Sequence, residues 1–146
     1  MPATNRFINI SSMSFTPSGG SLTAMKGVQS VSRNHNAQEE RGSGDGDFFD
    51  TFAGVVASNP SVNVEFLNIA ALNGVAVGTV GTLTWTENDA RNGATASGGG
   101  LIYTLANAVY QGPQTNSPHR KLATATIQST SYSSGGTTNP LSVTAA

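Results

Sequence analysis

Hydrophobic and polar residues alternate in several short stretches of the chain, which is the pattern of half-buried β-strands. The clearest stretch is residues 61–66 (SVNVEF), and residues 82–86 (TLTWT) repeat the alternation. Between them, Asn68 can cap a short helix over Ile69–Leu72. Because this region also holds Trp85, the only tryptophan, we take it as the core of a β domain.

Other stretches extend this pattern along the chain. The N-terminal stretch carries apolar residues of both parities, which indicates burial on both faces or a bulge near Ser11–Ser12. Gly27 weakens the second stretch, and we expect a loop over Gln111–Pro118. Many short strands without a long helix predict a mostly β fold, an antiparallel β-sandwich or small barrel with one short flanking helix. The further predicted strands are residues 7–15, 21–32, 101–110 and 122–131, with a last edge at 141–143.

One segment, from Arg33 to Asp47, departs from the alternating pattern. It has no large apolar residue, so it cannot bury enough surface to offset the entropy of ordering it. Apolar character returns at Phe48–Ala57, which we expect to re-enter the sheet. A loop of about 15 residues that leaves a sheet and returns is uncommon unless it is functional or disordered. We therefore predict a long polar loop over residues 33–47.

Composition narrows the classes of function. The 146 residues suit a single domain over 1–146. The formal net charge of −1 excludes a strongly basic surface for tight nucleic-acid binding, and a charged fraction of 10% favours a chain that exists in an assembly. Cysteine is absent, so disulfides and thiolate chemistry are excluded. Without a long apolar run or a signal-peptide pattern, we expect a soluble protein made in a cytoplasm.

The sequence offers no motif that predicts catalysis. The acidic run Asp45–Asp50 lacks the spacing, central glycine and closing glutamate of an EF-hand, so a solvated loop is favoured over a calcium site. His35 and His119 lie in no distinctive motif, and no nucleophile elbow occurs. We expect no catalytic residue, no metal, no cofactor and no enzyme activity.

An aromatic platform for a sugar is a further possibility. It would be built from Trp85 and the three tyrosines at positions 103, 110 and 132. Trp85 shares its parity with Leu83, however, and this inward-facing pattern favours a place in the core over a place on a platform.

Several motifs taken together resemble the bacteriophage tail tube (major tail) proteins. Their order and spacing cover most of the chain, although each is a strand or turn rather than a reactive signature. In chain order they are residues 27–31 (GVQSV) leading into the polar segment, residues 44–47 (GDGD) at its return, residues 62–66 with the short helix after them, residues 81–85 (GTLTW), residues 101–109, residues 123–127 (ATATI) and the tail sequence 133–141 (SSGGTTNPL).

The resemblance implies a structural virion protein. In this family six subunits close a ring whose lumen is lined by a continuous sheet, and rings stack into a tube that encloses the tape-measure protein and later passes DNA. Residues 33–47 would be the long assembly loop that reaches a neighbouring subunit or ring, and residues 132–146 the C-terminal tail. The implied subunit contacts in the loop are Arg33, His35, Gln38, Glu39, Glu40, Arg41, Asp45 and Asp47.

The resemblance also implies the partners and the location. The chain would associate with itself, with the tape-measure protein and with tail terminator or baseplate proteins. DNA would pass through transiently without specific binding, and no membrane would be involved. The protein would reside in the virion tail after assembly in the host cytoplasm.

Physical reasoning agrees with an assembled state. Strands with apolar residues on both faces need a second layer or a partner, and ring closure removes exposed sheet edges. We expect a large permanent interface, above ~2,000 Å² in total. Two alternatives stay open: another virion β module, such as a capsid decoration or head–tail joining protein, and a carbohydrate-binding β-sandwich. Electron microscopy would separate tubes, single rings and monomers.

Overall fold

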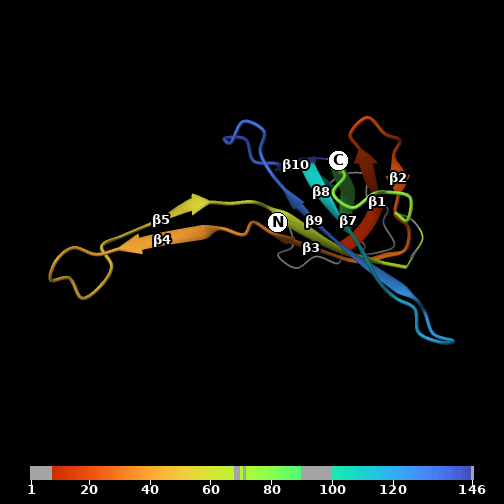
Figure 1. Cartoon of the computed structure of the whole chain (residues 1–146), viewed down its shortest axis with the longest axis horizontal. Helices are drawn as coiled ribbons and strands as arrows, with labels where there is room; N and C mark the ends of the chain where they lie inside the picture. The colour runs from red at the N-terminus through yellow and green to blue at the C-terminus, as the bar shows by residue number, and fades with distance from the viewer. Residues whose placement is uncertain (1–7, 68–69, 71, 90–99, 146) are drawn as a thin grey trace.

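The chain folds into a curled antiparallel sheet from which a separate two-stranded ribbon projects (Figure 1). The computed structural model describes residues 8–67, 70, 72–89 and 100–145. The predicted mostly β, antiparallel fold is confirmed. The strands are β1 (Ile8–Pro17), β2 (Thr23–Ala24), β3 (Val28–Asn34), β4 (Gln38–Gly42), β5 (Phe52–Ala57), β6 (Ser61–Phe66), β7 (Val80–Asp89), β8 (Leu101–Asn116), β9 (Thr124–Ser131) and β10 (Leu141–Ala145).

Strand β8 joins the two layers of the sandwich. The sheet order is β2-β1-β7-β8-β9-β6-β3, and β10 also pairs with β8. The first half of β8 pairs with β7 and β10, and its second half pairs with β9. Asn107 and Gly112 have positive φ, and the register shifts between Tyr110 and Pro113. Such bulges bend a strand and let it pass from one layer to the other. The ends of the sheet then approach each other, and β1 contacts β3.

The core lies between the two layers. Trp85 stacks on Tyr103 with 5.3 Å between ring centroids, and Phe15 lies 5.9 Å from Tyr110. Burial raises the pKa of Tyr110, whose hydroxyl donates a hydrogen bond to the Leu72 carbonyl. The prediction that Trp85 lies in the core is therefore confirmed. The buried apolar residues are Met13, Phe15, Met25, Val62, Val64, Phe66, Leu72, Leu83, Trp85, Leu105, Ala108, Tyr110, Ala125, Ile127 and Leu141.

The structure confirms two local predictions about irregular strands. The register of β1 against β7 shifts between Ser11 and Ser14, and Ser12 has φ of 55°, so the predicted bulge is present. The predicted strand over 21–32 divides into β2 and β3 at Gly27. This glycine has φ of +69°, and an added Cβ would lie 2.9 Å from the Cβ of Leu67, so both conformation and space favour glycine.

Four predictions need correction or fall outside the described residues. The polar segment 33–47 is not a continuous loop, because its first two residues end β3 and residues 38–42 form β4. Gln111–Pro118 is not a loop, because β8 runs on to Asn116 past the bulge at Gly112. The apolar run 48–57 does not re-enter the main sheet. Its β5 portion pairs with β4 in the ribbon, and the chain returns to the sheet at β6. The helix predicted over Ile69–Leu72 lies partly outside the described residues; Ala70 and Leu72 form turns, and the described part of the chain contains no helix.

Candidate assembly interface

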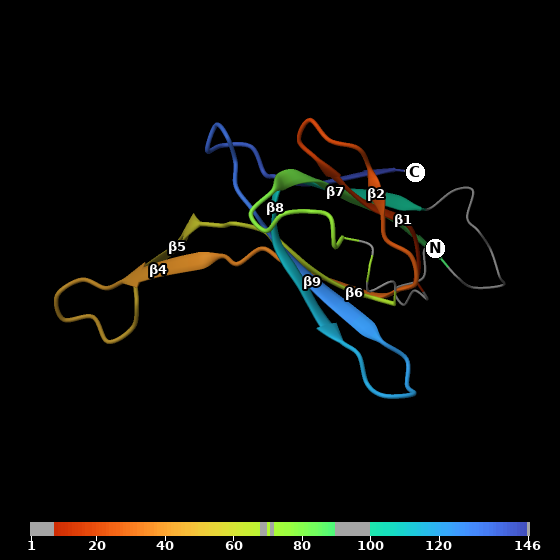
Figure 2. The same cartoon turned by 45° about the vertical axis from the view of Figure 1, so that its right-hand side comes forward.

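The most prominent surface feature is the ribbon of β4 and β5, residues 38–57, which we call the arm. It extends away from the sandwich in both views (Figures 1 and 2). Its strands pair only with each other in the described sheets, from Gln38 opposite Ala57 to Gly42 opposite Phe52. A two-stranded ribbon in water is marginally stable without a further layer, so this element favours a partner.

Hydrogen bonds hold the base of the arm where the chain leaves β3 and returns to β6. The Asn36 side chain donates to the Asn59 carbonyl and to the Ser61 hydroxyl, both at 2.9 Å. The Ser58 hydroxyl donates to the His35 carbonyl at 2.7 Å. Asn36 has φ of 51°, a left-handed conformation that asparagine tolerates better than most residues. These contacts fix the direction in which the arm leaves the sandwich.

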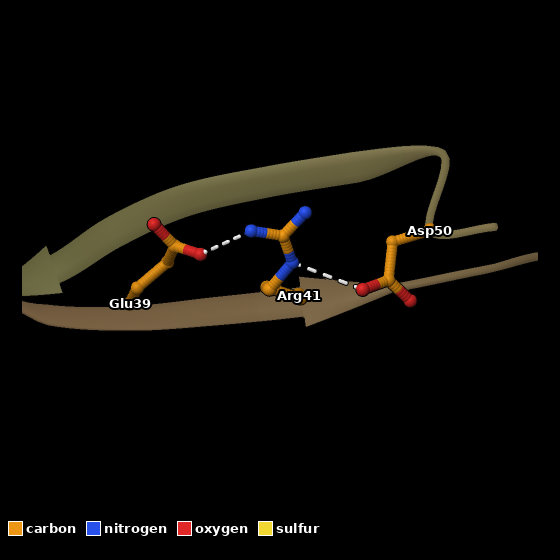
Figure 3. Close-up of polar contacts among 3 residues, drawn as sticks. All are labelled: Glu39, Arg41 and Asp50. Carbon is orange, nitrogen blue, oxygen red and sulfur yellow. Dashed lines mark hydrogen bonds and ion pairs between the residues drawn. The ribbon is translucent and has the colours of Figure 1, made fainter.

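One face of the arm carries a row of ionic contacts (Figure 3). The Arg41 guanidinium donates to Glu39 at 2.7 Å and to Asp50 at 2.9 Å. Hydrogen bonds to the carboxylates of Asp50 first, and then Glu39, raise the pKa of Arg41 above its ordinary value. All three side chains are exposed to solvent, where ion pairs add little stability. Because residues 38–50 hold five carboxylates and one arginine, the arm keeps an excess of negative charge.

The turn at the end of the arm is closed by its own polar groups. The Asp47 carboxylate accepts a hydrogen bond from the Gly44 backbone N–H at 2.8 Å, and the Asp47 N–H donates to the Gly44 carbonyl. Gly46 has φ of +84°, which favours glycine at this position. Asp47 therefore has a structural role in the turn and presents its charge at the end of the molecule.

Large apolar side chains cover the arm although it has no second layer. Phe48 and Phe49 meet edge to face, with 4.9 Å between centroids. Phe52 lies against Gly42 on the opposite strand, where an added Cβ would collide with the ring. Exposed aromatic and aliphatic groups concentrated on one projection mark an interaction surface. The exposed fractions are 91% for Phe48, 77% for Phe49, 65% for Phe52 and 62% each for Val55 and Val56.

The structure divides the residues predicted as subunit contacts between two settings. Arg33 lies in β3, where its guanidinium bonds Glu87 at 3.1 Å and sits 3.9 Å over the Tyr103 ring. It thus braces β3 against β7 and β8. His35 lies at the base of the arm. The other six predicted residues, Gln38, Glu39, Glu40, Arg41, Asp45 and Asp47, lie in β4 or the turn and are all exposed.

Sequence reasoning missed the apolar part of this surface. The run that holds Phe48, Phe49 and Phe52 predicts a buried strand, because apolar runs usually indicate burial. The run gives no contrary signal: residues 52–56 (FAGVV) show no polar alternation, which also fits a strand buried on both faces. The polar character of the strand that pairs with them, β4, becomes informative only once that pairing is known.

A second projection lies at the far end of the molecule. The hairpin of β8 and β9 extends beyond the sandwich (Figures 1 and 2) and ends in residues 117–122, which we call the basic tip. His119, Arg120 and Lys121 are exposed there, and Leu122 is 70% exposed. Arg120 has φ of 58°, as part of the tight connection. The two projections thus carry opposite charge.

The described residues offer little for chemistry or for sugar stacking. They contain no group of three or more potential metal-ligating side chains close enough to hold an ion. Trp85 and Tyr110 are buried and Tyr103 is half-buried, which leaves Tyr132, 44% exposed, as the outward ring of the suggested aromatic platform. Within the described residues, no helix has the length and apolar character needed to cross a bilayer.

The comparisons with known proteins identify a shared fold. No family model and no curated protein matches the chain. A chain of the anti-feeding prophage (AFP) baseplate, solved by cryo-EM and 6-fold symmetrised, is similar in structure, with a TM-score of 0.55 and 11% sequence identity. The match covers 99% of this chain and 96% of that chain. At this identity the match shows that the two chains share a fold over nearly their whole lengths.

Proposed function

We propose that the chain is a structural subunit of a phage-tail-like particle, which forms rings with its own copies that stack into the tail tube. The observation that carries the proposal is the arm. Its five large apolar side chains are 62–91% exposed on a ribbon that is marginal in water alone. A second copy would supply the missing layer, as in permanent assemblies.

The fold supports the same class of function. The similar chain belongs to a sixfold-symmetrised baseplate, and this chain's motifs resemble the tail tube family. Baseplate and tube both require repeated subunits with closed symmetry, and heterologous contacts between identical chains generate rings. The sequence and the fold therefore agree on a tail-like particle, and the tube is the more specific proposal.

A polar sheet face suits the bore of such a tube. Strands β6 and β9, which the structure describes in full, present Asn63, Glu65, Thr126 and Gln128 outwards. Three of these side chains, Asn63, Thr126 and Gln128, border an open groove together with Gln111 and Gln114 of β8. A surface of amides and hydroxyls with one carboxylate offers no apolar patch and no cation to retain phosphate. We assign this face to the lumen, where cargo must slide.

The proposed partners follow from this assembly. They are other copies of the chain, a tape-measure protein inside the tube, and terminator or baseplate proteins at its ends, with DNA passing without specific binding. The proposed location is the virion tail, after assembly in the host cytoplasm. The role is mechanical, and no catalytic step or cofactor belongs to it.

A second candidate is a ring of the baseplate rather than of the tube shaft. The observation that favours it is the assembly that holds the structurally similar chain, which is a baseplate. The two candidates share ring formation and differ in whether rings stack indefinitely. A carbohydrate-binding function is less favoured, because three of its four candidate aromatic rings are buried or half-buried.

Negative-stain electron microscopy of the purified full chain tests the proposal. We expect rings that stack into long tubes of constant diameter. Single rings that do not stack would favour the baseplate candidate. Monomers at high protein concentration, measured by light scattering coupled to size exclusion, would contradict both.

A further inference from the structure

We propose that the basic tip of one copy is the docking site for the arm of a neighbouring copy. This inference rests on the proposed function and adds the surface that receives the arm. It depends on three properties of the two projections: their opposite charges, their exposed apolar groups and their positions in the molecule.

Charge is unevenly divided between the projections. Residues 38–50 hold five of the chain's eight carboxylates and one arginine, which gives a formal charge of −4. Residues 117–122 hold Arg120 and Lys121 and no carboxylate, which gives +2 with His119 neutral. Patches of opposite sign steer association and set its register.

The negative charge of the arm is available to a partner. Arg41 already bonds Glu39 and Asp50 on one face of the ribbon. Glu40 is the neighbour of both Glu39 and Arg41 in β4, so it lies on the opposite face. Asp45 is exposed in the turn. The carboxylates of Glu40 and Asp45 are therefore exposed to a partner, the first on the face of the ribbon opposite Arg41 and the second at the end of the arm.

Each projection pairs its charges with an exposed apolar group. On the arm, Phe48 and Phe49 follow Asp47 and precede Asp50. On the basic tip, Leu122 follows Lys121 directly. Leucine can pack on the phenylalanine rings, and a guanidinium or ammonium group can lie over a ring face. A contact between the two surfaces would satisfy charges and apolar groups together.

The positions of the projections require that the contact be made between copies. The arm and the basic tip lie at opposite ends of the longest axis (Figure 1) and stay well separated after the turn to the second view (Figure 2). One chain therefore cannot bring its own arm to its own tip. Joining unlike surfaces on successive copies is a heterologous contact, which builds closed rings or open stacks.

A charge-swap experiment tests the inference. The tip variant carries Arg120→Glu and Lys121→Glu, which changes the formal charge of the tip from +2 to −2. The arm variant carries Glu39→Lys, Glu40→Lys and Asp45→Lys, which changes the formal charge of the arm from −4 to +2. Each variant alone opposes like charges at the contact, so we expect its critical concentration for assembly to rise at least about tenfold. In an equal mixture, every arm finds a tip of opposite charge, and we expect assembly to recover. Light scattering and electron microscopy measure both effects.

A matched control separates this contact from a general effect of charge. Lys121→Glu and Lys26→Glu change the net charge equally, and Lys26 is an exposed residue outside both projections. We expect the Lys121→Glu variant to assemble more weakly, and we expect the Lys26→Glu variant to assemble like the original chain. Equal behaviour of the two single variants, or a mixture no better than its components, would overturn the proposed docking.

Cross-linking separates failure of this inference from failure of the proposed function. The chain has no cysteine, so Ser43→Cys combined with Leu122→Cys reports a contact directly through a short bismaleimide. Ser43 is an exposed residue of the turn, and replacing it keeps the Asp47 contacts and the charge of the arm. We expect dimers and higher ladders, and none from Ser43→Cys combined with Lys26→Cys. Tubes without ladders would refute the docking and keep the proposed function. Ladders without rings or tubes would keep the docking and refute the tube. The absence of both ladders and tubes would refute both the docking and the proposed function.

Discussion

Removing the arm tests whether the sandwich folds without it and whether assembly depends on it. We consider replacing residues 38–57 with Asn-Gly, which forms a tight two-residue turn. The base is narrow enough for this closure, because Ser58 bonds the His35 carbonyl and Asn36 bonds the Asn59 carbonyl across it. These residues remain in the shortened chain, so the base contacts are kept.

The expected change in stability is small or favourable. The large apolar side chains of the arm are at least 62% exposed, and its strands pair with each other. The sandwich core therefore loses little burial. Shortening the connection from about 20 residues to two lowers the loop-closure cost by about 2 kcal/mol. For a chain of this size we expect Tm to stay within about 2 °C or to rise by up to about 6 °C.

Assembly is expected to fail in the same variant. Circular dichroism and calorimetry measure the fold, while electron microscopy and light scattering measure rings and tubes. A folded, monomeric product would show that the arm serves assembly and not the core. Normal tubes from the shortened chain would refute the role of the arm, and a loss of the folded state would refute its independence from the sandwich.

Three further predictions follow from the described contacts. Phe48→Ser with Phe49→Ser leaves Tm unchanged and weakens assembly, whereas Leu22→Ser, at a comparably exposed site outside the arm, affects neither measurement. Asn36→Ala lowers the free energy of unfolding more than Asn36→Gly does, by about 1 kcal/mol in denaturant titration, because glycine accepts the positive φ and both variants lose the same side-chain hydrogen bonds. Leu105→Ala destabilises by about 2–5 kcal/mol, because Leu105 is fully buried; a shift below 1 kcal/mol in the same titration would contradict the assigned core.

The strands with regular alternation could be predicted from the sequence because alternation follows directly from a sheet with one buried face. Val62, Val64 and Phe66 are buried in β6, and Asn63 and Glu65 between them are exposed. The bulge near Ser11 was one of two alternatives that the sequence left open, since a change of parity within one strand indicates either burial on both faces or an irregularity.

The arm was not predictable by the same reasoning. Alternation reports burial within one chain, whereas β4 and β5 have no buried face in the isolated chain. The extension of β8 through Pro113 was missed because proline usually interrupts a sheet. Gly112, with φ of +89°, forms a bulge that accommodates it. Neither the exposed ribbon of β4 and β5 nor the bulge at Gly112 produces a periodic pattern of apolar residues in the sequence. The predicted role of residues 33–47 in subunit contacts stays a prediction.

The separation of the arm from the core has a physical consequence for assembly. Trp85, Leu83 and Leu105 are fully buried within one chain, so the core of the sandwich is built without residues from a partner. In the proposed assembly, the arm keeps its aromatic groups exposed until a second copy covers them, and its base is already fixed by the hydrogen bonds of Asn36. The ordering cost of the base is thus met during folding, and less entropy opposes association. A folded subunit can then add to a growing assembly by rigid docking, with the opposite charges of its two ends favouring one orientation.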